Sequence, residues 1–152
     1  MKIEVSGKDD YVIFLNRSYL RNVNFSEKDD VIIFIKDFLL KLKSYLCLRG
    51  FYKVKVFPQD KIGMFLELLK LDDMDLSNNL DLRIIVMQEE KFFFETDDYD
   101  LIKNCNNKRY YEGHFYCVVD DYFDELLEKV EFGRFIYGKE VINLLNKGIV
   151  LW

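Results

Sequence analysis

The chain has 152 residues, of which 50% are hydrophobic and 32% are charged, and its formal net charge is −5. This length and apolar content suit one domain, or two very small ones, and they exclude a disordered chain. The sequence has no apolar run long enough to span a bilayer and no signal-peptide pattern at its start. We therefore expect a cytoplasmic protein that has no membrane partner.

The first 71 residues predict a ββαββ unit. Strands are indicated at 2–6 and 11–16 around a turn at 7–10, and a second pair at 51–57, where apolar and charged residues alternate, and at 64–71, which is apolar on both faces. The helix between the two pairs should cover one face of the resulting sheet.

Ser26 is the expected N-cap of this helix, because serine is favourable there and acidic residues follow it in the first turn. Apolar residues then recur at three- and four-residue steps, which is typical of an amphipathic helix. They are Val31, Phe34, Ile35, Phe38, Leu39, Leu42, Tyr45 and Leu46. Among them, we expect Phe34, Phe38 and Leu42 to be buried against the sheet.

The acidic segment 72–79 is the expected linker between two units, 1–71 and 80–152. Residues 1–71 carry 13 basic and 9 acidic groups (+4), whereas residues 72–152 carry 9 basic and 18 acidic groups (−9). This asymmetry suggests two units with different partners, and the acidic half disfavours nucleic acid because phosphates would be repelled. The alternative is an ordinary loop, with both units packed as one domain.

The second half predicts a β-rich unit with short helices. Hairpins are expected from 80–87 with 91–95 and from 109–111 with 114–119, the second around the turn signal Glu112-Gly113. Short helices are expected at 97–105, 121–130 and 139–146, and a strand at 134–137. The fold class is therefore α+β, with two successive antiparallel sheet-plus-helix units.

The sequence contains no glycine-rich phosphate loop, calcium loop or common hydrolase motif. The three cysteines are isolated and the only histidine is His114, so we expect neither a metal site nor another cofactor. A small hydrolase or transferase is one alternative, in which Asp97, Asp98 and His114 supply an acid and a base. Because aspartates commonly begin helices, we instead expect a protein that is not an enzyme.

Aromatic side chains dominate the energetics of protein interfaces, and carboxylates steer basic partners toward them. The second half is rich in both, so we place a protein-partner site on the hairpin 110–119 and the segment 132–137. Its expected residues are Asp97, Asp98, Asp100, Tyr111, Phe132, Arg134 and Tyr137.

Several short motifs, taken in order, resemble the MecA-type adaptor family. They are Met1-Lys2-Ile3-Glu4, the helix from Ser26 with the strand pair ending at Leu71, Phe94-Glu95-Thr96-Asp97-Asp98-Tyr99-Asp100-Leu101-Ile102, Arg109-Tyr110-Tyr111-Glu112-Gly113-His114-Phe115-Tyr116-Cys117-Val118-Val119-Asp120, and Val130-Glu131-Phe132-Gly133-Arg134-Phe135-Ile136. The resemblance implies an N-terminal substrate-binding domain and a C-terminal domain that engages a Clp-type AAA+ unfoldase. It also implies that no residue is catalytic.

We therefore expect a non-enzymatic adaptor or regulator of proteolysis that brings a client protein to such an unfoldase. An inhibitor or immunity-type protein with a single partner is a further alternative, and a homodimer is compatible with each of these functions.

Overall fold

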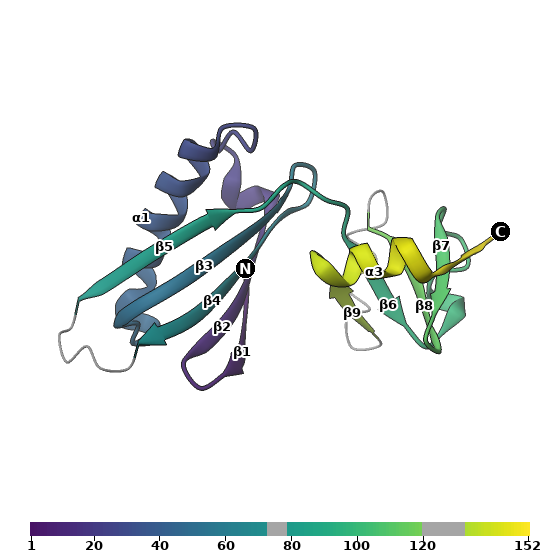
Figure 1. Cartoon of the computed structure of the whole chain (residues 1–152). Coiled ribbons are helices and arrows are strands. Elements are labelled where there is room, and N and C mark those ends of the chain that lie inside the picture. Colours follow the sequence, from purple (N-terminus) through teal and green to yellow (C-terminus); the bar gives the residue numbers. More distant parts are fainter. Residues whose placement is uncertain (73–78, 120–132) are drawn as a thin grey trace. The chain divides into compact units, whose positions relative to one another are not determined.

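The computed structural model describes residues 1–72, 79–119 and 133–152 (Figure 1). The chain divides into two compact units, Met1–Glu89 and Glu90–Trp152. Each unit contains a five-stranded sheet and one of the two α-helices found among these residues. The predicted α+β class is thereby confirmed.

The first sheet has the strand order β1-β2-β4-β3-β5. The elements of this unit are β1 Lys2–Gly7, β2 Asp10–Asn16, the 3₁₀-helix η1 Arg17–Leu20, α1 Lys28–Leu46, β3 Gly50–Gln59, β4 Gly63–Asp72 and β5 Leu80–Val86. Alternation along β3 explains why one face is buried. Tyr52, Val54 and Val56 lie in the core, whereas Lys53 and Lys55 lie on the opposite face.

Helix α1 covers the core face of this sheet (Figure 1). Its buried residues are Val31, Ile35 and Leu39. Phe34, Phe38 and Leu42, which we expected to be buried, are only half-buried at the flank of the same core cluster. Tyr45 is exposed, so the apolar stripe is narrower than the sequence predicted near the end of the helix.

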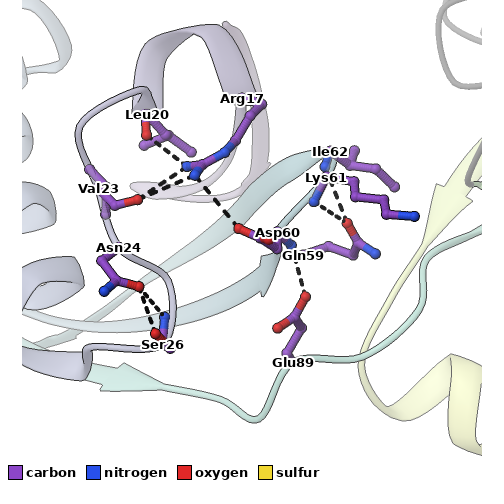
Figure 2. Close-up of polar contacts among 10 residues, drawn as sticks. All are labelled: Arg17, Leu20, Val23, Asn24, Ser26, Gln59, Asp60, Lys61, Ile62 and Glu89. Atoms are coloured by element: carbon purple, nitrogen blue, oxygen red, sulfur yellow. Dashed lines mark hydrogen bonds and ion pairs between the residues drawn. The ribbon is translucent and has the colours of Figure 1, made fainter.

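The start of α1 lies one residue later than predicted. Glu27 occupies the N-cap position, and no side chain caps the helix there. The Ser26 hydroxyl instead donates to Asn24 Oδ1 at 2.6 Å, and the Ser26 N–H donates to the same oxygen at 3.1 Å (Figure 2). A local turn built on Asn24 therefore fixes the chain before the helix.

A set of polar contacts holds one end of the first unit together (Figure 2). The guanidinium of Arg17 donates to the carbonyl oxygens of Leu20 at 2.7 Å and Val23 at 3.3 Å. It also pairs with the Asp60 carboxylate at 3.6 Å, in the turn between β3 and β4. The Asp60 N–H donates to Glu89 Oε1 at 2.9 Å, so the last residue of this unit is attached to the same turn.

The boundary between the units follows Glu89 and does not lie in the segment 72–79, as the sequence suggested. Strand β5 does not form the expected hairpin with 91–95 but pairs in parallel with β3 along its whole length. The apolar residues of β5 that pack against the first core are Leu80, Leu82, Ile84 and Val86. An alternating strand can bury its apolar face on either sheet, so the pattern alone could not assign it.

The new boundary changes the distribution of charge. The first unit carries 14 basic and 14 acidic residues, whereas the second carries 8 basic and 13 acidic residues, a net charge of −5. The acidic character therefore belongs to the second unit, and the first unit is neutral.

The second sheet has the strand order β10-β7-β8-β6-β9. The elements of this unit are β6 Phe93–Thr96, the 3₁₀-helix η2 Tyr99–Leu101, β7 Lys108–Tyr111, β8 His114–Val118, β9 Gly133–Ile136, α3 Lys139–Lys147 and β10 Ile149–Leu151. The predicted β7–β8 hairpin is confirmed, and its turn residues Glu112 and Gly113 both have positive φ, as a tight hairpin requires. Val141 and Leu144 of α3 join a core cluster on one face of the sheet.

One expected helix of the second half differs in the structure, one strand was not expected, and one expected helix cannot be compared. The helix expected at 97–105 is a single 3₁₀ turn, because side chains of Thr96 and Asp98 accept the backbone N–H groups of Asp98 and Asp100 and compete with helical bonds. Strand β10 was not predicted. The helix expected at 121–130 lies outside the described residues.

Candidate protein-binding surface

Three aromatic rings stand in a row on the sheet face opposite α3. Tyr110 of β7 is directly opposite Phe115 of β8, with ring centroids 5.4 Å apart. Tyr99 of η2 meets the same phenylalanine edge to face at 5.3 Å. We call Tyr99, Phe115 and Tyr110 the aromatic row. Both tyrosines are 37% exposed, so a large part of the row is open to solvent.

Lys108 holds one end of the aromatic row in place. Its side chain is buried, and its ammonium donates to the Tyr99 hydroxyl at 3.1 Å and to the Lys103 carbonyl at 3.0 Å. The same ammonium lies 5.3 Å from the centroid of the Tyr99 ring. These contacts restrict the tyrosine before any partner arrives, which lowers the entropic cost of binding.

Exposed carboxylates flank the aromatic row. Asp98 and Asp100 precede and follow Tyr99 in the chain, and Asp97 contacts the imidazole of His114 at the start of β8. Asp98 Oδ1 accepts the Asp100 N–H at 3.0 Å, which fixes the local turn. The three aspartates expected at the partner site are thus next to the predicted hairpin.

Arg134 lies on the other face of the sheet, within a network of paired charges. Its guanidinium donates to Glu95 from Nε at 2.9 Å and to Glu140 of α3 from Nη2 at 2.8 Å. The Tyr116 hydroxyl donates to Glu95 Oε2 at 2.6 Å. This guanidinium is already committed to two carboxylates, so its contacts indicate a role in joining β9, β6 and α3.

The pKa values in this network follow from the same contacts. Burial raises the pKa of Glu95, but hydrogen bonds from Arg134 and Tyr116, together with the charge of Arg134, outweigh it and leave that pKa below its usual value. Burial, followed by the bond to Glu95, raises the pKa of the Tyr116 phenol. At neutral pH the network is therefore an ionised carboxylate held between a cation and a neutral hydroxyl.

The remaining expected residues are not brought to the aromatic row. Tyr111 packs against the core cluster under α3, and Tyr137 meets Phe92 edge to face at 6.3 Å. Phe132 lies outside the described residues. Tyr110 and Phe115 lie within the hairpin 110–119, where the sequence placed the partner site, although neither was among the residues selected there, and Tyr99 lies outside that hairpin. Alternation along the hairpin could have placed Tyr110 and Phe115 on one face, but nothing local predicted that Tyr99 would join them.

Metal-dependent or thiol chemistry would need a cluster of metal ligands or a reactive cysteine. Within residues 1–72, 79–119 and 133–152, no group of three His, Cys, Asp or Glu side chains could hold a metal ion. Cys105 and Cys117 are buried and reduced, and burial raises the pKa of the Cys117 thiol further above the range of a reactive cysteine. In the described part of the chain, no helix is both long and apolar enough to cross a membrane.

Comparisons of this chain with protein-family models, with curated proteins and with solved structures found no match.

Proposed function

We propose that the protein is a non-enzymatic adaptor or regulator, and that it binds a protein partner through the aromatic row of its second unit. The observation that carries the proposal is the set of three contacting rings at the surface, two of them tyrosines with 37% exposure. Tyrosine is enriched among the residues that dominate interface energetics, because it supplies a large rigid contact area with a polar tip.

The neighbouring aspartates supply the second part of the proposal. Asp97, Asp98 and Asp100 are exposed beside the aromatic row, and the second unit carries a net charge of −5. Charges of this kind accelerate the encounter with a basic partner, whereas the buried contact controls how long the complex lasts. We therefore propose a partner with a basic rim around an apolar patch.

The resemblance to MecA-type adaptors supplies a finer form of the proposal. In that form, the second unit docks on a Clp-type AAA+ unfoldase and the first unit holds a client protein in the cytoplasm. The order of the quoted motifs supports it, and the test is whether a Clp-type unfoldase is recovered with the tagged full chain.

A small hydrolase is the second candidate, and one contact favours it. His114 Nδ1 meets the carboxylate of Asp97, which is the arrangement of a base and the group that orients it. Both side chains are more than a third exposed, however, whereas general-base chemistry benefits from a site that excludes water. If the protein is a hydrolase, the unsubstituted chain has a hydrolytic activity that His114→Ala abolishes. If it is an adaptor, neither the unsubstituted chain nor His114→Ala has hydrolytic activity.

Binding kinetics test the main proposal. The full chain is used to capture a partner from a host extract, and the association and dissociation rates are then measured by surface plasmon resonance. Reversing Asp97, Asp98 and Asp100 to lysine should slow association several-fold at low salt and leave dissociation nearly unchanged. The difference should shrink at 1 M salt, where the Debye length falls to about 3 Å.

The matched controls use the neutral first unit. Reversal of Glu27, Asp29 and Asp30, which are exposed at the start of α1, alters the net charge equally and should leave association unchanged. Tyr110→Ala should speed dissociation at least ten-fold, as expected for an interface anchor. The proposed surface would be refuted if both triple reversals change the association rate equally and Tyr110→Ala leaves the dissociation rate unchanged.

A further inference from the structure

Strand β10 lies at one edge of the second sheet. Among the strands the structure describes, only β7 pairs with it, through Ile149↔Tyr110, Val150↔Arg109 and Leu151↔Lys108. No other described strand pairs with its outer side, and the outer backbone N–H and C=O groups of an edge strand are in the arrangement that another strand can bind. In Figure 1 this segment is the yellow end of the chain that follows α3.

The side chains of β10 do not protect this edge. Ile149 is 64% exposed and Val150 is 46% exposed, and the register places them on opposite faces of the sheet. Edge strands of monomeric proteins usually carry charged residues or proline that discourage pairing. The other described edges follow this rule: Lys2 and Glu4 lie in β1, Asp81 and Arg83 in β5, and Arg134 in β9.

The adjacent end of α3 extends the apolar surface. Only Gly148 separates the helix from β10, so the last helical turn lies at the same edge. Leu145 and Ile142 of this helix are both exposed, and they are three positions apart in the chain, so they share one side of the helix. Val150 faces the same side of the sheet as α3, because its partner Arg109 pairs in turn with Tyr116 of the cluster under the helix.

We propose that a second copy of this chain covers the β10 edge, by antiparallel pairing of β10 with β10 of the partner about a twofold axis at Val150. This register places Ile149 of each copy opposite Leu151 of the other, so an apolar residue meets an apolar residue at every position. No charge lies within Ile149–Leu151 to oppose the approach. An isologous contact of this kind closes on itself and yields a dimer and not a filament.

The dimer should be weak. The pairing strands contain three residues each, and the flanking apolar patch consists mainly of Val150, Leu145 and Ile142. Stable interfaces usually bury about 800 Å² on each partner, with about 20–30 residues a side, whereas this contact is built on two strands of three residues. We therefore expect association at micromolar to sub-millimolar concentrations, which the following experiment covers.

Sedimentation velocity of the full chain, between about 5 μM and 1 mM, tests this proposal. The weight-average mass should rise with concentration from the monomer value of 18.4 kDa toward twice that value. Val150→Lys places a charge on the edge and should keep the chain monomeric throughout. Ile33→Lys is the matched control, because Ile33 is an exposed apolar residue of α1 in the other unit, and it should behave as the unsubstituted chain.

Circular dichroism of both variants verifies that they are folded, and amide hydrogen exchange supplies a second readout that needs no variant. Exchange in the peptide covering 148–152 should slow several-fold between the lowest and the highest concentration. A monomer at 1 mM would overturn the proposal, as would a Val150→Lys variant that associates like the unsubstituted chain. The proposal would also be overturned if the unsubstituted chain is monomeric and Val150→Lys no longer binds a captured partner. That result would assign the edge to a strand of the partner.

Discussion

Replacing Glu95 with glutamine tests whether the network that joins β6, β9 and α3 stabilises the second unit. The Glu95 side chain is only 13% exposed, and it accepts the Tyr116 hydroxyl at 2.6 Å and Arg134 Nε at 2.9 Å. Hydrogen bonds to charged groups contribute about 1.5–3 kcal/mol, but Arg134 is 56% exposed and solvent screens its part of the interaction. We therefore expect a loss of about 1–2 kcal/mol in the free energy of unfolding of this unit.

The assay must report on each unit separately, because the chain contains two compact units that need not unfold together. Urea unfolding followed by pulsed hydrogen exchange and mass spectrometry provides this, since peptides from β6 and β8 report on the second unit. Tyr116→Phe is the matched control: it removes one hydroxyl, leaves Glu95 paired with Arg134, and should cost no more than about 1 kcal/mol.

The loss of stability caused by Glu95→Gln should depend on pH in one direction. The pKa of folded Glu95 lies below its ordinary value of 4.5, so ionised Glu95 stabilises the folded state above that value. This contribution is lost as the pH falls through the lower folded pKa. The difference between the unsubstituted chain and Glu95→Gln should therefore be largest near pH 7 and should shrink toward pH 3. A difference that is negligible at pH 7, or that grows as the pH falls, would refute this account of the network.

Three further predictions concern the first core, the turns and metal. Leu39→Ala should cost about 2–5 kcal/mol in urea unfolding because it opens a cavity, whereas Ile33→Ala, at an exposed position of the same helix, should stay within about 0.5 kcal/mol. A Cβ at Gly63 would lie 2.0 Å from the Leu15 carbonyl oxygen with φ at +141°, whereas one at Gly113 meets nothing within 4 Å. Gly63→Ala should therefore lower the thermal unfolding midpoint far more than Gly113→Ala, and equal shifts would contradict this. Elemental analysis after dialysis should find no stoichiometric zinc, and one tightly held zinc per chain would show that the isolated cysteines and histidine had been misjudged.

Local patterns predicted most of the elements because each depends on neighbours in the chain. Alternation identified β3, an apolar run identified β4, and a turn signal preceded β2. The Glu112-Gly113 signal identified the β7–β8 hairpin, whose turn requires two positive φ values. The short helix at the end of the chain was also predicted to within one residue. In each of these cases the hydrogen bonds or the apolar face are fixed by residues a few positions apart.

The assignment of β5 depended on contacts that no local pattern contains. Its alternation predicted a strand, but its partner β3 begins about thirty residues earlier in the chain and pairs with it in parallel. The charge change at 72–79 suggested a boundary there, but two of the acidic residues near it, Asp72 and Asp81, belong to β4 and β5 of the first sheet. The true boundary follows Glu89, which is held by the turn at Asp60.

For the candidate surface too, local patterns predicted some of the residues, and contacts between distant segments decided the others. Sequence reasoning placed Asp97, Asp98 and Asp100 beside the hairpin, and the structure brings them there through η2. It also selected Arg134, whose guanidinium proves to be held by two carboxylates on the opposite face. Which face a residue of a short strand occupies depends on register, and register was not available from the separate motifs.

Site-specific photo-crosslinking tests the central claim most directly. A benzophenone amino acid in place of Tyr110, in the full chain expressed in its host, should yield a covalent adduct with a protein partner on irradiation. The same substitution at Tyr19, which is an exposed tyrosine of the first unit, is the matched control and should yield no such adduct. An adduct at Tyr19 with none at Tyr110, or no adduct at either position, would contradict the claim that the aromatic row binds a protein.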